Sequence, residues 1–296
     1  MDNLRGAIMM VCAMFFFAVE DAFIKFLASD FPVGQILAII SGGAAIGFAV
    51  YLRLRGIPLW HRDYLHPKVL LRSGVDVVGS LMFSTSLALI PLTTASAVLQ
   101  ATPIVVAMGA ALFLGQEVGW RRWIAICVGF CGVMLIVRPG MEGFTPQTLL
   151  AVGGMLGLAS RDLITRGLNL PLSGPQLSLH VFALMAPAGV LLAVVLGQDL
   201  AMPNGPQSAI FAVAIVFGMG AYLLIVAATR DGNAGIISSF RYSRMVFALV
   251  IGYVVFAERP DALTLIGATI VVGSGLYTLM REARLARSSK LAKAAL

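Results

Sequence analysis

The sequence predicts an all-α integral membrane protein with ten transmembrane helices, arranged as two inverted five-helix repeats. Its 296 residues are 59% hydrophobic and only 12% charged, about half the charged fraction of an ordinary soluble domain. A helix that spans a bilayer needs roughly 20 apolar residues, so ten such helices would take most of the chain. This composition excludes a water-soluble fold and leaves no room for a sizeable soluble domain.

Ten apolar runs define the expected helices in order. They cover residues 4–27, 33–52, 69–90, 94–114, 120–137, 148–166, 175–196, 206–229, 234–256 and 263–280. The first run is too long for a cleaved signal and lacks a small-residue cleavage site after it, so we expect a spanning helix. Turn signals that contain proline or glycine, at 30–32, 138–140 and 203–205, support the partition into runs.

Lysine and arginine lie mostly on one side of this predicted topology. With the N-terminus inside, 14 of them fall in inner loops and tails and only Lys25, Arg138 and Arg259 fall outside. The positive-inside rule therefore places both termini in the cytoplasm of a bacterial-type inner membrane. The net charge of +7 reflects this topology rather than nucleic-acid binding, because no basic run is interleaved with aromatic residues.

An offset of 141 residues repeatedly pairs like residues in the two halves of the chain. The matches are Asp21 with Asp162, Lys25 with Arg166, Gln35 with Gln176, Gly79 with Gly220, Glu117 with Glu258 and Gly132 with Gly273. Because each half has five helices, the second must enter the membrane inverted. We expect a first repeat at 1–140, a second at 141–282 and a basic cytoplasmic tail at 283–296. Inverted repeats are typical of secondary transporters whose halves rock about a midplane site.

Four stretches carry a family resemblance. They are FAVEDAFIK at 17–25, PLTTASAVLQATP at 91–103, FLGQE at 113–117 and GFCGVML at 129–135. With them the chain resembles the drug/metabolite transporter superfamily in its EamA-type ten-helix branch, and within it the bacterial exporters of aromatic and other hydrophobic amino acids. The resemblance implies a central cavity within helices 1–4 and 6–9, with helices 5 and 10 to one side, often at a dimer contact. A monomer or a homodimer is therefore expected. The RYSR stretch at 241–244 departs from the pattern at 100–103.

Ionisable residues within the spans are functional candidates, because burying them in a bilayer is costly unless they are paired or face water. The expected substrate cavity contains Glu20, Asp21, Asp76, Gln100, Ser239, Arg241, Tyr242 and Arg244. Arg244 lies at the predicted midplane of the ninth helix, and a guanidinium holds a carboxylate through two parallel hydrogen bonds. The alternative is a buried ion pair that only locks the ninth helix to helix 1 or 3. Gln100 lies just before Pro103, which can open the fourth helix.

Two acid–base pairs are candidate gates, one near each mouth. Asp21 with Lys25 and Asp162 with Arg166 are both spaced i, i+4, so each pair shares a helix face. The alternative is a local salt bridge in each place, with Lys25 and Arg166 reaching toward the headgroups. The lone His180 gives no reason to expect a bound metal, and we expect no cofactor.

The function predicted from these features is a secondary transporter of small metabolites, and most specifically an amino-acid exporter that works by alternating access. Arg244 would bind the carboxylate and Glu20 or Asp21 the ammonium group. Candidate apolar walls are Phe16, Phe17, Tyr242 and Phe247. The alternatives are a nucleoside-like metabolite carrier, a drug-type exporter whose cations the arginines would repel, a channel, and a membrane enzyme. The sequence has no HExxH, GxSxG or CxxC motif and no P-loop, so we expect gradient-driven transport and no enzyme activity.

Overall fold

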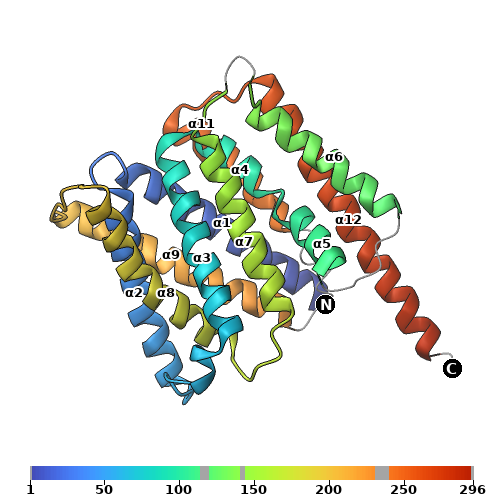
Figure 1. Cartoon of the computed structure of the whole chain (residues 1–296), viewed down its shortest axis with the longest axis horizontal. Coiled ribbons are helices and arrows are strands. Elements are labelled where there is room, and N and C mark those ends of the chain that lie inside the picture. The colour runs from blue at the N-terminus through green and yellow to red at the C-terminus, as the bar shows by residue number, and fades with distance from the viewer. Residues whose placement is uncertain (1, 114–119, 141–143, 231–239, 295–296) are drawn as a thin grey trace.

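The computed structural model describes residues 2–113, 120–140, 144–230 and 240–294, and its regular elements in these ranges are all helices (Figure 1). They are α1 (Asp2–Leu27), α2 (Val33–Leu54), η1 (Arg62–Leu65), α3 (Pro67–Leu89), α4 (Leu92–Leu99), α5 (Thr102–Phe113), α6 (Trp120–Val137), α7 (Thr148–Arg166), α8 (Gly174–Val195), α9 (Gly205–Arg230), η2 (Phe240–Tyr242), α11 (Ser243–Phe256) and α12 (Ala262–Ala294). Within the described ranges, six helical segments are long and apolar enough to cross a membrane: Leu4–Leu27, Val33–Leu54, Leu92–Phe113, Thr148–Arg166, Gly174–Val195 and Gly205–Ala228. The all-helical class is confirmed, and the count of ten spans stays a prediction.

The fourth expected helix is broken in its middle. α4 and α5 are separated at Gln100 and Ala101, because Pro103 has no N–H to donate to the carbonyl of Leu99, as a continuous helix would require. In the second half, the short η2 ends at Tyr242 and α11 begins at Ser243. Arg241 and Tyr242 lie 141 residues beyond Gln100 and Ala101, so the change from η2 to α11 falls at the same place in the repeat register as the break between α4 and α5.

Helices of the first half pack along helices of the second. α1 lies along α9, α2 along α8, α3 along α7, and α6 along α12 (Figure 1). Gly157 of α7 packs so closely on α3 that an added Cβ would lie 2.6 Å from the Cα of Gly79. In the equivalent α1–α9 contact, Gly220 lies against the ring of Phe16. Small residues thus allow close helix contacts at matching positions in both halves.

Turns and loop contacts also follow the 141-residue offset. Gly56 and Gly197 come just after α2 and α8 and take φ angles of 67° and 62°, a left-handed conformation that glycine adopts without steric cost. Gln35 hydrogen-bonds the backbone of the loop after α8. Gln176 donates to the backbone of the loop after α2 at 3.1 Å. Each half therefore uses a glutamine at the same register position to hold a loop of the other half.

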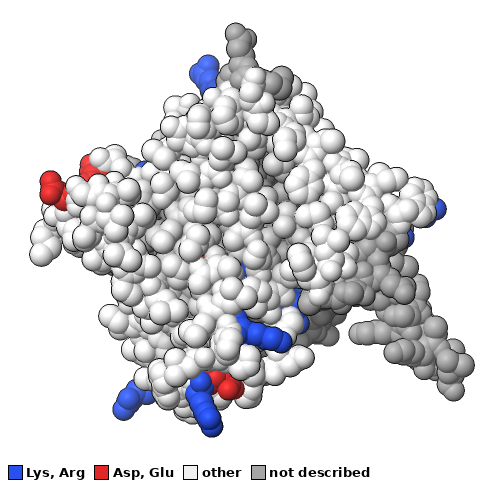
Figure 2. All heavy atoms as spheres, in the orientation of Figure 1, with Lys and Arg blue, Asp and Glu red and all other residues white. Residues whose placement is uncertain are grey.

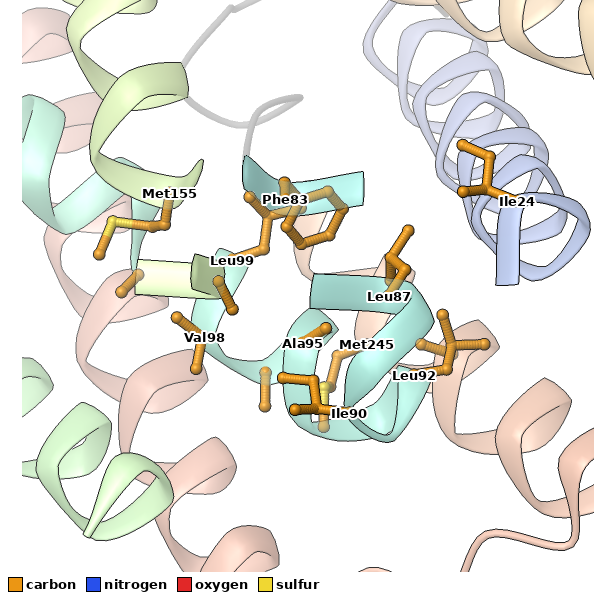
Figure 3. Packing of buried hydrophobic residues seen from close by; sticks show 14 of the residues in the cluster. Ile24, Phe83, Leu87, Ile90, Leu92, Ala95, Val98, Leu99, Met155 and Met245 are labelled. Carbon is orange, nitrogen blue, oxygen red and sulfur yellow. The ribbon is translucent and has the colours of Figure 1, made fainter. Parts of the chain in front are cut away.

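An apolar cluster closes the end of the bundle where α3 turns into α4. Figure 3 shows Leu87, Ile90 and Leu92 around this turn, with Met245 of α11 beside them and Ile24 of α1 nearby. All five side chains are buried. This is the end of the bundle that the predicted topology places outside the cell.

The last helix is longer than expected. α12 continues past residue 280 to Ala294, so the basic segment that was expected as a separate tail is part of the same helix as far as the structure describes it. Figure 2 shows charged side chains mainly toward the edges of one face of the molecule, with uncharged residues over most of it. Such a surface suits a lipid environment.

Candidate functional site

A central cavity of about 360 Å³ lies between the helices that carry the polar residues of the spans. Its charged lining residues are Glu20, Asp21, Arg72, Arg161, Asp162, Arg241 and Arg244, and its aromatic ones are Phe17, Phe83, Phe182 and Tyr222. The lining extends from the middle of α1 to Thr165 and Gly174, where α7 ends and α8 begins. The cavity therefore reaches toward the side that the sequence places in the cytoplasm.

Arg244 is held by Asp21. The two side chains lie 2.6 Å apart between Nη2 and Oδ2, and Nε of Arg244 lies 3.2 Å from the same oxygen. The guanidinium also lies 5.0 Å from the ring centroid of Phe17 and 5.8 Å from that of Phe83. These contacts match the alternative of an ion pair that joins the ninth helix to the first. Arg244 also lines the cavity, so its role as a carboxylate site stays a prediction.

A second charged cluster connects α3, α7 and η2. Asp76 lies 3.4 Å from Arg72 and 3.1 Å from Arg161. Asp162 lies 2.9 Å from Arg161 and 3.6 Å from Arg241. Three arginines thus share two aspartates, and the cluster carries one positive charge in excess. Arg241 has the longest contact and the most exposed side chain of the five, 34%, so the excess charge is most accessible there. Asp76 is buried behind the cavity lining.

The expected pair of Asp21 with Lys25 is wrong in the structure. Lys25 donates to the backbone oxygens of Leu87 at 3.1 Å and Ile90 at 2.7 Å, and its ammonium lies 3.6 Å from Glu258. Carbonyls at a helix C-terminus attract a cation, and the end of α3 offers Lys25 partners that the i, i+4 spacing does not reveal. Asp21 is at the same time occupied by Arg244.

Glu258 binds the start of α4 as well as Lys25. Its carboxylate accepts hydrogen bonds from the backbone N–H of Leu92 at 2.6 Å and of Thr93 at 3.0 Å, and from the Thr93 hydroxyl at 2.9 Å. A carboxylate is stabilised at a helix N-terminus by these free N–H groups and by the helix dipole. Lys25 and Glu258 together therefore tie α1, α3, α4 and the end of α11 at the end of the bundle that the predicted topology places outside the cell.

The other expected gate pair also has different partners. Asp162 makes its ion pairs with Arg161 and Arg241, whereas Arg166 is exposed at the end of α7. A neighbouring arginine and one from another element lie closer to this carboxylate than the residue one turn away. Sequence spacing alone therefore does not identify its partner.

Two other predicted residues meet at the helix breaks. The Gln100 side chain donates to the backbone oxygen of Tyr242 at 3.1 Å, so the break between α4 and α5 contacts the junction of η2 and α11. The Tyr242 side chain is buried against Gly275 of α12 rather than in the cavity lining. Ser239 lies outside the described residues.

Of the four expected apolar walls, the structure places Phe17 in the cavity lining. Phe16 packs on Phe217, with ring centroids 4.6 Å apart, and Phe247 packs on Phe15 at 5.3 Å. The wall instead gains Phe182 and Tyr222, whose rings contact each other at 5.3 Å. Sequence analysis missed this pair because α8 and α9 are apolar on all sides, so periodicity does not show which face lines a cavity.

Glu20 lies at the α1–α9 side of the cavity. Its carboxylate packs on the backbone of α9 at Gly218, in space that a side chain at Gly218 would occupy. In the part of the chain that the structure describes, Glu20 makes no hydrogen bond and no ion pair. Among the described residues that line the cavity, Glu20 is thus an acid without an ion-pair partner.

Comparison with protein families and curated proteins gives consistent matches over nearly the whole chain. The model of the EamA-like transporter family matches residues 4–138 and 146–280. A riboflavin transporter of Vibrio cholerae is 27% identical over 97% of this chain and 97% of its own length. An S-adenosylmethionine uptake transporter of Rickettsia felis is 27% identical over 75% of this chain and 73% of its own length.

An exporter is also among the relatives. The pseudopaline exporter CntI of Pseudomonas aeruginosa is 25% identical over 92% of this chain and 95% of its own length. A solved structure titled "Crystal structure of protein" has a TM-score of 0.65 at 15% identity and covers 96% of this chain and 97% of its own. This likeness shows a shared fold over the full length of both chains.

Proposed function

The chain belongs to the EamA-like transporter family, and from this membership and its charged cavity we propose that it carries an anionic or zwitterionic organic metabolite by alternating access. The family and the names of the relatives indicate a multi-pass membrane transporter of small metabolites rather than an enzyme. They also fit the inner membrane of a bacterium as its location.

The observation that carries the proposal is the excess positive charge at Arg241. Its guanidinium lines the cavity, is one-third exposed and shares Asp162 with Arg161 over a distance of 3.6 Å. A carboxylate or phosphate on the substrate would take the place of the missing counter-charge and gain a charge-assisted hydrogen bond. The same charge argues against a drug-type substrate that is purely cationic.

The size and the walls of the cavity favour a substrate with a planar ring. A volume of about 360 Å³ falls in the range of roughly 300–1,000 Å³ that is typical of pockets for drug-sized ligands. Phe17 and Phe182 both contact Tyr222, at 5.4 and 5.3 Å between ring centroids, and form an aromatic wall. Relatives named for riboflavin and S-adenosylmethionine point in the same direction, toward the nucleoside-like alternative. They do not support the amino-acid export that the sequence predicted.

The transport cycle would use the two inverted repeats of the sequence prediction. Support comes from the α4–α5 break and the η2–α11 junction at matching positions, from the glycines Gly56 and Gly197, and from the reciprocal pairing of α1 with α9 and α3 with α7. We assign the structure to the state that is open toward the cytoplasm. Lys25 and Glu258 would hold its outer side closed, in place of the expected pair of Lys25 with Asp21.

Transport into liposomes tests this function directly. Purified protein would be reconstituted and supplied side by side with labelled riboflavin, S-adenosylmethionine, a set of amino acids and a quaternary ammonium drug. We expect uptake of S-adenosylmethionine or another ring-containing metabolite that bears an anionic group, and little uptake of the drug. Riboflavin, which has a planar ring but no anionic group, separates the contribution of the ring from that of the charge. Exclusive transport of the quaternary ammonium drug would contradict the proposal, and so would the absence of any transport by folded protein.

A further inference from the structure

Glu20 is a charged group that the proposed substrate site does not use. Asp21, Asp76 and Asp162 each have at least one arginine within 3.6 Å, whereas Glu20 has no ion pair or hydrogen bond among the described residues. Its carboxylate borders the cavity and packs on the α9 backbone at Gly218.

The surroundings of Glu20 offer it little compensation for a negative charge. The charged and titratable groups that face it are Asp21 on the same helix, Arg244 on α11 and Tyr222 on α9. Asp21 repels a second negative charge and also holds the nearest cation, Arg244, at 2.6 Å. The rings of Phe16 and Phe217 pack together on the same α1–α9 contact.

We propose that Glu20 binds and releases one proton in each transport cycle, so that the proton gradient drives the carrier. An ionised carboxylate without a partner is costly inside a membrane, and a bound proton removes this cost without another protein group. While the cavity is open to water the proton can exchange with the adjoining solution. When both ends are closed the carboxyl crosses in its neutral form and releases the proton on the other side.

This inference rests on the proposed transport function, but one test does not depend on any substrate. Infrared difference spectra of the purified protein, titrated between about pH 5 and pH 9, report the C=O stretch of protonated carboxyl groups. We expect a titrating carboxyl band that Glu20→Gln removes. Asp199→Asn, which changes an exposed acid in the loop after α8, should keep the band. An identical titrating band in Glu20→Gln would overturn the inference.

A second variant covers the case in which Glu20→Gln does not fold. Gly218→Ala leaves the carboxyl in the chain but adds a Cβ where the carboxylate now lies. The side chain can move aside, so we expect a folded protein whose carboxyl band titrates with a shifted midpoint. A band that is unchanged in Gly218→Ala would show that the titrating group is not Glu20.

Liposomes then test the coupling itself. In the wild type, a pH gradient of one polarity should accelerate uptake of the transported metabolite and the opposite polarity should slow it. Glu20→Gln should still exchange labelled for unlabelled metabolite but respond equally to both polarities. Wild-type uptake that ignores the gradient would refute the proton role alone, whereas absence of uptake would refute the proposed function. Loss of exchange in folded Glu20→Gln would make Glu20 a substrate contact instead.

Discussion

Replacing Lys25 by Met should open the outer side of the protein. Lys25 donates to two backbone oxygens at 2.7 and 3.1 Å and lies 3.6 Å from Glu258, and its side chain is 17% exposed. Methionine keeps the length of the side chain and removes all three polar contacts. If these contacts exist only in the state that is closed on the outside, their loss shifts the balance toward the state that is open there.

The expected size of this shift follows from the contacts. Hydrogen bonds to charged groups contribute about 1.5–3 kcal/mol each. Water replaces the partners of Lys25 when the outer side opens, so we count the three contacts together as one such bond. A change of about 1.5–3 kcal/mol corresponds to roughly a 10- to 150-fold change in the ratio of the two states.

Labelling of a single cysteine in the cavity measures this ratio. Ser80 lines the cavity and is partly exposed, so Ser80→Cys in a variant without the three native cysteines gives a reporter. Lys25→Met should raise the rate of labelling by an impermeant thiol reagent from outside and lower it from inside. The control Lys68→Met changes an exposed lysine in the first turn of α3 and should alter neither rate. Equal rates in Lys25→Met and the control would refute the role of Lys25 in closure.

Three further changes test other contacts. Arg138 holds the pKa of Asp261 down at about 2 through hydrogen bonds, against 3.8 for a free side chain. The stabilisation from this lowered pKa is complete above pH 3.8 and is lost as the pH falls through about 2. The difference in melting temperature between wild type and Asp261→Asn should therefore stay constant from neutral pH down to about pH 4.5. Gln100→Leu should lower the free energy of unfolding by about 1–3 kcal/mol, because the buried backbone oxygen of Tyr242 loses its donor. An unchanged melting temperature would contradict this contact. Gly157→Ala should lower the free energy of unfolding by about 1–3 kcal/mol in the same assay, since the new Cβ would meet the backbone of α3. A free energy of unfolding equal to that of the wild type would show that α3 and α7 can separate there.

Composition predicted the helical class, Pro103 predicted the break in the fourth helix, and polar residues in apolar runs predicted part of the cavity lining: Glu20, Asp21, Gln100, Arg241 and Arg244. Gln100, Arg241 and Arg244 were found from sequence because polar side chains in apolar runs are rare and costly. The structure places Gln100 at the break between α4 and α5, and Arg241 and Arg244 beside the junction of η2 and α11. A polar residue within an apolar run can thus be recognised from the sequence one residue at a time, without knowledge of its partner.

Partners could not be predicted in the same way. Lys25 lies 62 and 65 residues from the two oxygens that it binds, and 233 residues from Glu258. The i, i+4 rule considers only neighbours on one helix, and its interaction energy is a few tenths of a kcal/mol. Free carbonyls at the end of another helix and a charge held against a helix start outweigh it. Tyr222 is a similar case, because α9 is apolar on all sides. Only the packing of α9 against other helices determines that this side chain faces the cavity.

The effect of Arg241 on substrate affinity tests the central claim most directly. For whichever metabolite the wild type carries, the KM of Arg241→Gln should rise roughly 10- to 150-fold, which corresponds to the loss of one charge-assisted hydrogen bond of about 1.5–3 kcal/mol. Arg53→Gln, at an exposed arginine near the end of α2, should leave the KM unchanged. An analogue without the anionic group should have the same KM in wild type and Arg241→Gln. Equal KM values of the two variants for the charged metabolite would contradict an anion site at Arg241.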